Sequence, residues 1–124
     1  MNVPAELHFT ITHEWLRVDG DEVTLGITDY AQSELGDIVY VDIPEVGKVL
    51  QAGQSVCTVE SVKTVSDVYT PVGGEIIATN QDLEGTAELI NQDPYGKGWI
   101  VKMRVDSQPT GLLDADGYKA VLEA

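Results

Sequence analysis

The sequence predicts a mainly β protein, folded as a small sandwich of two antiparallel sheets with short helices. Short β-favourable runs are separated by Gly, Pro, Asn and Asp turn residues along most of the chain. The pair Asp19-Gly20 between two such runs is a strong hairpin signal, and apolar and polar residues alternate cleanly over 99–105. A chain of 124 residues suits one compact domain, so we expect residues 1–124 to form a single unit.

The first part of the chain is expected to form a hairpin and then a helix. Residues 14–18 and 22–27 are the two strands that flank the Asp19-Gly20 turn. Residues 29–35 read as a helix of about two turns. Asp29, followed three residues later by a glutamine, imitates a capping box, and Gly36 can end the helix in a left-handed conformation.

The rest of the chain is expected to be strands and turns up to a C-terminal helix. The further strands are 37–43, 49–50, 55–59, a pair that flanks Lys63, 75–79 and 99–105. In the last of these, one face carries Trp99, Val101, Met103 and Val105. Segment 82–91 has too many turn residues for more than a single helical turn, and 93–98 reads as a loop. Asp114 is the expected N-cap of a terminal helix.

A faint internal repeat indicates a structure in two halves. The segments 47–50 and 74–77 both read Gly, polar, apolar, apolar. Each is followed, after two residues, by a residue that tolerates positive φ and then by Gln, namely Gly53-Gln54 and Asn80-Gln81. The midpoint of the repeat falls beside Lys63.

Composition excludes several classes of partner. Seven Lys and Arg stand against 21 Asp and Glu, giving a net charge of −14, which argues against nucleic acid and anionic membranes as partners. This charge serves either solubility or steering towards basic patches on partner proteins. No apolar run approaches the roughly 18 residues that span a bilayer. Residues 1–10 lack the features of a signal peptide, so we expect the cytoplasm, or the mitochondrial matrix if a presequence has been removed.

The sequence contains few of the residue patterns that are typical of catalytic sites. Cys57 is a lone cysteine in an apolar run and reads as a buried core thiol. With His8 and His13 as the only histidines, no zinc set of familiar spacing can be built, so no metal site is expected. The chain has no nucleophile elbow, P-loop or dinucleotide fingerprint. We therefore predict that it is not an enzyme and has no catalytic residues of its own.

Lys63 stands apart from the other lysines. It is the only Lys, Arg or His between Lys48 and Lys97. Stiff β-branched residues surround it, with Glu60 and Asp67 on either side, so we expect a hairpin with this lysine at its tip. A tip lysine carries its amine on a flexible stem and suits covalent attachment of a swinging arm. From spacing alone, an ordinary solvated lysine remains an alternative.

The segment ESVKTVSDVYTPVGGEI resembles the lipoylation segment of the H proteins of the glycine cleavage system. The segments THEW, GITDYAQSELGDIVYVDIPEVG, AELIN, DPYGKGWIVKM and LLDADGY also fall in the order that this family shows. The resemblance covers nearly the whole chain. The departures are small: Thr64 and Val65 follow the lysine where Ala is frequent, and Gly73 stands where Ser is frequent.

The resemblance implies a lipoyl/biotinyl-type sandwich, or barrel-sandwich hybrid, with lipoate in amide linkage to Lys63. It implies a carrier that takes the aminomethyl group of glycine from a pyridoxal-phosphate glycine decarboxylase (P protein) to a tetrahydrofolate-dependent aminomethyltransferase (T protein). A dihydrolipoyl dehydrogenase (L protein) then reoxidises the arm. A lipoyl-attaching enzyme is a fourth partner. The hard chemistry belongs to lipoate and to the partners' cofactors.

The resemblance also suggests roles for other residues. The loaded arm is expected to dock in a cleft near THEW, where Glu14 pairs with the cationic amine and His13 stands beside it. Independently of the resemblance, Glu60 and Asp67 flank Lys63 on the hairpin without an obvious core role, and we expect the lipoyl-attaching enzyme to contact Glu60, through a basic group, more than Asp67. For each of these four, a purely structural or solvated role is the alternative. Trp15, Trp99 and Tyr95 are expected to be core or loop residues.

Other functions stay open at this stage. A biotinyl domain would show Met on both sides of its lysine, where Val62 and Thr64 stand. A lipoyl domain of a 2-oxoacid dehydrogenase would lack the THEW and DPYGKGW segments. An H-like protein that relays lipoyl groups to other enzymes, or an unmodified acidic interaction module, would fit the sequence too. With no long amphipathic helix or exposed heptads, a monomer is the expectation.

Overall fold

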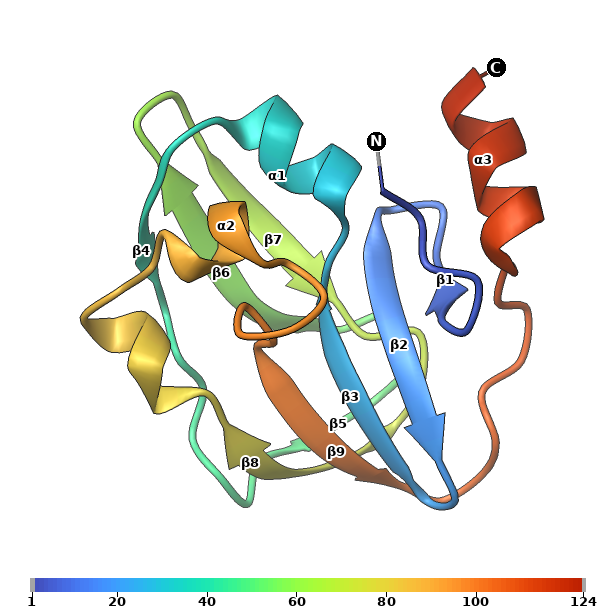
Figure 1. Ribbon diagram of the computed structural model, residues 1–124. Coiled ribbons are helices and arrows are strands. Elements are labelled where there is room, and N and C mark those ends of the chain that lie inside the picture. Colours follow the sequence, from blue (N-terminus) through green and yellow to red (C-terminus); the bar gives the residue numbers. More distant parts are fainter. Residues whose placement is uncertain (1, 124) are drawn as a thin grey trace.

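Residues 2–123 of the computed structural model form two antiparallel sheets, and this confirms the predicted mainly β sandwich (Figure 1). The larger sheet has six strands in the order β1-β2-β3-β9-β8-β5, and the smaller has three in the order β4-β6-β7. The strands are β1 (His8–Phe9), β2 (Glu14–Asp19), β3 (Glu22–Ile27), β4 (Ile38–Val41), β5 (Val49–Leu50), β6 (Ser55–Ser61), β7 (Val65–Tyr69), β8 (Gly74–Thr79) and β9 (Val101–Val105).

The helices lie outside the sheets. They are α1 (Asp29–Leu35), a 3₁₀ turn η1 (Gln81–Glu84), α2 (Leu89–Gln92) and α3 (Ala115–Glu123). The segment expected to hold a single turn thus forms one 3₁₀ turn and one α turn. The predicted C-terminal helix is confirmed by α3. Asp114, its expected N-cap, accepts a hydrogen bond of 2.7 Å at Oδ1 from Gly117 N. None of the helices within residues 2–123 is long and apolar enough to cross a membrane.

The β2–β3 hairpin forms as predicted. Asp19 lies opposite Glu22, so the loop consists of Gly20 and Asp21 alone. Gly20 takes φ 63°, a conformation that glycine reaches without the steric cost that a Cβ imposes. This hairpin matters for the site because the start of β2 carries Glu14 and the end of β3 leads directly into α1.

Helix α1 has the predicted bounds, but its predicted cap is wrong by one residue. Thr28, not Asp29, is the N-cap, and its hydroxyl accepts a hydrogen bond from Ala31 N. The Asp29 carboxylate instead accepts from the Gln32 side chain and from Asn2 N. A threonine hydroxyl competes well for this position, and local sequence did not distinguish the two. Gly36 ends the helix with φ 79° and ψ −153°, outside the left-handed helical region and accessible essentially to glycine alone.

The internal repeat corresponds to a strand pair. Strands β5 and β8 are antiparallel neighbours, with Val49 opposite Glu75 and Leu50 opposite Gly74. Gly53 takes the expected positive φ of 90°, but Asn80 does not, because its φ is −85°. The buried Asn80 side chain instead caps η1 and donates to the carbonyls of Lys97 and Trp99. These tertiary bonds, rather than backbone freedom, account for an asparagine at this position.

Two hydrophobic clusters fill the molecule. The inner cluster lies between the two sheets and includes Val101, Met103 and Val105 of β9. The outer cluster lies against the other face of β2, beneath α3, and consists of Leu7, Phe9, Trp15, Tyr95, Ala115 and Tyr118. Trp99 was expected in the same strand as Val101, Met103 and Val105 and on the same face, and this is wrong. It precedes β9 and packs half-buried against the outer cluster.

Candidate carrier site

Lys63 lies at the exposed tip of the β6–β7 hairpin, as predicted. The last strand pair joins Glu60 to Val65. Ser61 then builds the turn: its backbone N–H donates to Thr64 O at 2.8 Å, and its buried hydroxyl accepts from the backbone N–H groups of Lys63 and Thr64. A serine hydroxyl that bonds nearby backbone groups stabilises tight turns of this kind. Sequence reasoning did not single out Ser61.

The tip contacts the two residues that follow α1. Val62 N donates a hydrogen bond of 3.0 Å to Asp37 O. The Lys63 stem lies against Gly36, since a Cβ built on Gly36 would stand 2.9 Å from Lys63 Cε. The absent side chain at Gly36 therefore leaves the space through which the lysine stem passes.

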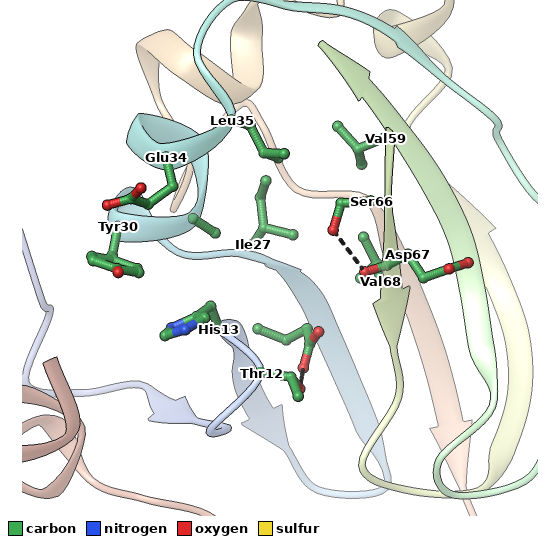
Figure 2. A pocket seen from close by; sticks show the side chains of 12 residues that line it. Thr12, His13, Ile27, Tyr30, Glu34, Leu35, Val59, Ser66, Asp67 and Val68 are labelled. Atoms are coloured by element: carbon green, nitrogen blue, oxygen red, sulfur yellow. Dashed lines mark hydrogen bonds between the residues drawn. The ribbon is translucent and has the colours of Figure 1, made fainter. Parts of the chain in front are cut away.

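A cleft of about 150 Å³ opens between α1 and the β6–β7 hairpin (Figure 2). Its apolar walls include Ile27, Leu35, Val59 and Val68, and its polar lining includes Thr12, His13, Glu14, Tyr30, Glu34 and Ser66. Leu35 of this wall immediately precedes Gly36, the residue that Lys63 contacts. Lys63 is not part of the lining, but α1 connects its stem to the cleft.

Glu14 is buried at the inner end of the cleft, with only 2% of its surface exposed. Its Oε1 accepts hydrogen bonds from the hydroxyls of Thr10 and Thr12, and its Oε2 accepts from Tyr69 N at 3.2 Å. Burial raises the pKa of this carboxyl, while the hydrogen bonds oppose that shift. The alternative of a solvated strand residue is therefore wrong. Thr12 and Thr10, two and four positions before Glu14, were the sequence signal for a buried, hydrogen-bonded carboxylate, and this signal was missed.

His13 stands beside Glu14 in a turn with an unusual backbone. Its φ of 72° lies in the left-handed region, which few residues other than glycine adopt, although His does so more often than most, as do Asn and Asp. The ring packs against Tyr30 of α1 with centroids 4.7 Å apart, and Nδ1 lies 2.8 Å from the hydroxyl of Tyr118. Burial lowers the pKa of His13, and the charge of Glu34 partly opposes this. The structure thus places His13 and Glu14 in one cleft.

The side chains of Glu60 and Asp67 lie on the outer face of the hairpin, although Asp67 also contributes to the lining of the cleft. Alternation along β7 directs Ser66 and Val68 inwards and Asp67 outwards, and Figure 2 shows the Asp67 carboxylate pointing away from the cavity. Thr58 faces Asp67 across the strand pair, so Glu60, two residues on, shares its face. The two acids differ in one respect: Asp67 Oδ1 accepts a bond of 2.9 Å from Ser55 Oγ, whereas Glu60 is exposed.

Neither the cysteine of the chain nor a cluster of metal ligands within the described residues supplies a catalytic centre. Cys57 is buried, and burial together with Asp42 and Asp67 raises the pKa of its thiol to about 12, so it is not a nucleophile. Within residues 2–123, no group of three or more His, Cys, Asp and Glu side chains is placed to hold a metal ion.

The site consists of a lysine at the tip of a hairpin, beside an apolar cleft that can shelter an attached group. This arrangement suits a small carrier domain rather than an enzyme. The chain belongs to the glycine cleavage H-protein family, whose family model matches residues 7–124. Members of this family are carriers and not catalysts.

Known relatives match the whole length of the chain. A glycine cleavage system H protein of Thermus thermophilus is 56% identical and covers 100% of this chain and 98% of its own. One of Bacteroides thetaiotaomicron is 54% identical over 98% of each. The crystal structure of a glycine cleavage system H protein from Mycobacterium marinum superimposes with a TM-score of 0.91 at 37% identity, covering 98% of this chain and 100% of that one.

Proposed function

We propose that the chain is the lipoylated carrier of a glycine cleavage system, with lipoate in amide linkage to Lys63. The observation that carries this is the position of Lys63 in a chain of this family: an exposed tip lysine whose stem lies against Gly36, the residue that follows Leu35 of an apolar cleft wall. Lipoate, once attached, would supply a disulfide that is reduced as it accepts the aminomethyl group of glycine and whose dithiol form is later reoxidised. The protein supplies the rest, namely a presented amine, a docking cleft and surfaces for its partners.

The cleft residues fit the attached group and its cargo. Apolar walls of Ile27, Leu35 and Val68 suit an acyl chain. Glu14 suits the cationic amine at the end of the arm. A carboxylate has about four lone-pair sites, and three of those on Glu14 are taken by protein donors. One site is left for a charge-assisted bond, which would hold the amine without preventing its release.

The two faces of the hairpin suit two tasks. Glu60, exposed on the outer face near Lys63, is accessible to the lipoyl-attaching enzyme. Val62 and Val65 at the tip are more than half exposed and add apolar contact area around the amine. Glu14 and His13, on the cleft face, meet the arm only after it has been attached and loaded. Asp67 is a secondary contact for the attaching enzyme because Ser55 already engages it.

The partners follow from the proposed role: a glycine decarboxylase, an aminomethyltransferase, a dihydrolipoyl dehydrogenase and the lipoyl-attaching enzyme. Tethering on Lys63 makes each delivery effectively intramolecular once a partner has docked. The charge of −14 would steer the carrier towards basic patches on these proteins. We place this work in the cytoplasm, or in the mitochondrial matrix if a presequence has been removed, and expect a monomeric carrier.

Mass spectrometry tests the attachment directly. Protein co-expressed with a lipoate ligase and lipoate should gain one lipoyl mass, which peptide sequencing should map to Lys63. Lys63→Arg should abolish this gain and glycine–CO₂ exchange with the decarboxylase, yet shift stability by less than about 0.5 kcal/mol because the tip is exposed. Lys48→Arg, at another exposed lysine, is the matched control and should behave as the wild type. A lipoyl mass on Lys63→Arg would refute the assignment.

A further inference from the structure

The hydroxyl of Tyr118 joins three elements that are far apart in the sequence. Tyr118 lies on α3, is 0% exposed, and stacks on Phe9 with ring centroids 4.8 Å apart. Its hydroxyl lies 2.8 Å from His13 Nδ1 and 2.7 Å from Thr28 Oγ1. Stacking alone would be served as well by phenylalanine. The hydroxyl therefore needs an explanation of its own.

One partner of this hydroxyl lines the cleft, and the other caps the helix that forms one wall of it. His13 lines the cleft itself. Thr28 caps α1, the helix that forms one wall, and its backbone N–H donates to His13 O at 3.0 Å. The chain of bonds from His13 through Tyr118 to Thr28 thus ties the turn before β2 to the start of α1. It adds a side-chain connection to the direct backbone bond between His13 and Thr28 and to the pairing of β2 with β3.

The hydrogen-bond inventory shows how the three groups satisfy one another. Thr28 Oγ1 already accepts from Ala31 N, and its own proton can go to Tyr118. Tyr118 can then donate its proton to His13 Nδ1. In this direction of the chain, neutral His13 carries its proton on Nε2. Each hydroxyl has a donor and an acceptor, so removal of the middle one leaves the Thr28 hydroxyl proton without an acceptor and half-buried His13 Nδ1 without a donor.

The His13 turn has particular need of such a bond. A histidine at φ 72° is held in a sparsely populated conformation, which persists only when the surrounding structure determines it. Without Tyr118, the ring keeps its contact with Tyr30 but loses its polar anchor. The backbone is then free to relax towards more common conformations. Because Glu14 follows directly, such relaxation also moves the inner end of the cleft.

We propose that Tyr118 is a positioning residue: the C-terminal helix uses its hydroxyl to clamp His13 and the start of α1, and thereby holds the cleft in the shape that retains the loaded arm. This inference rests on the proposed function, since it assumes that the arm docks there. It assigns a role to α3, an element distant in sequence from Lys63, Glu60 and Asp67.

The test compares Tyr118→Phe with Tyr95→Phe. Tyr95 is the matched control because its buried hydroxyl also contacts the start of α1, accepting from Asp29 N at 2.9 Å and donating to Asn2 O. It does not touch His13. Both variants lose one buried hydroxyl, so a general loss of stability affects both, and only a specific clamp distinguishes them.

Two measurements are made on each variant. In the unmodified protein, the nitrogen NMR shift of His13 Nδ1 should move in Tyr118→Phe and stay unchanged in Tyr95→Phe. In lipoylated protein loaded with the aminomethyl group, ammonia release without the transferase should be about fivefold faster in Tyr118→Phe, the factor expected from roughly 1 kcal/mol. Release from Tyr95→Phe should match the wild type. If Tyr118→Phe does not fold, His13→Asn replaces it, since Asn tolerates positive φ but lacks the ring, and the same acceleration is expected.

The possible results distinguish failure of this inference from failure of the proposed function on which it rests. Equal ammonia release from lipoylated Tyr118→Phe and wild type would overturn the inference and leave the carrier role intact. Equally faster ammonia release in both tyrosine variants would also overturn the inference, since loosening of the start of α1 would then explain the faster release without a bond to His13. Absence of a lipoyl mass on Lys63 of the wild type would overturn the proposed function itself, and the inference with it.

Discussion

Glu14 is a carboxyl group that the fold keeps from water while supplying it with three hydrogen-bond donors. Burial is the dominant cause of its raised pKa, so the folded protein binds a proton on Glu14 at pH values where the unfolded chain has lost it. The free energy of unfolding therefore falls as pH rises from the ordinary value of 4.5 towards the raised one. This cost is consistent with a group retained for binding rather than for stability.

Glu14→Gln tests this sign. Gln cannot ionise, so the variant should gain stability relative to the wild type as pH rises through that window, by about 1.4 kcal/mol for each pH unit between the two pKa values. A constant loss will accompany this gain, because the Gln amide cannot accept from Tyr69 N. Urea unfolding at several pH values measures both. A flat stability difference between Glu14→Gln and the wild type across these pH values would contradict the assigned burial cost.

Glu60 and Asp67 carry the same charge on the same face of the hairpin but differ in their local bonds. We expect Glu60→Gln to slow lipoylation of Lys63 about tenfold, the effect of losing one charge-assisted contact with the attaching enzyme. Its melting temperature should not change. Asp67→Asn should slow the reaction less but cost up to about 1 kcal/mol of stability, because Ser55 loses a charged acceptor. Equal lipoylation rates for Glu60→Gln and wild type would reduce Glu60 to a solubilising residue.

At the scale of the elements, the connection between α1 and the hairpin depends on Gly36. Gly36→Ala should destabilise the fold by about 1–3 kcal/mol, since its backbone conformation is one that Ala seldom adopts. The new Cβ should also displace the Lys63 stem and slow lipoylation. Gly53→Ala is the control, because Gly53 has φ 90° but nothing within 4 Å of an added Cβ. Both variants should lose stability in urea unfolding. If both are lipoylated at the wild-type rate, the Gly36–Lys63 contact has no functional role.

The elements that could be predicted from the sequence are those with a local cause. The bounds of α1 and β3 follow from turn residues and alternation. The predictions that were wrong concern residues whose conformation depends on partners distant in the sequence. Asn80 is fixed by carbonyls 17 and 19 residues away, and Trp99 by a hydrophobic cluster that local periodicity does not reveal. At the site, Lys63 and the pair His13-Glu14 could be named from resemblance. Tyr118 could not, because its bond to His13 spans 105 residues and leaves no local pattern.

The whole molecule is organised around β2, which belongs to both hydrophobic clusters. Successive side chains of a strand point to opposite faces, so Leu16 enters the inner cluster while Trp15 enters the outer one. Trp15 is also fixed by its indole N–H, which donates to Pro94 O at 2.9 Å. Two clusters that share a strand cannot unfold independently if each depends on that strand. On this ground we propose that residues 1–124 form one cooperative domain.

Urea unfolding observed by two probes tests this proposal. In a Trp99→Phe background, fluorescence reports Trp15 and the outer cluster, whereas far-UV circular dichroism reports both sheets. The two transitions should coincide, with one midpoint and a slope of about 1–3 kcal/mol per molar urea, as for other small two-state domains. If Trp15 fluorescence changes at lower urea than the sheet signal, the outer cluster opens first. The carrier would then be a sandwich with a separable C-terminal helix, and the bonds of Tyr118 to His13 and Thr28 would be lost before the sheets unfold.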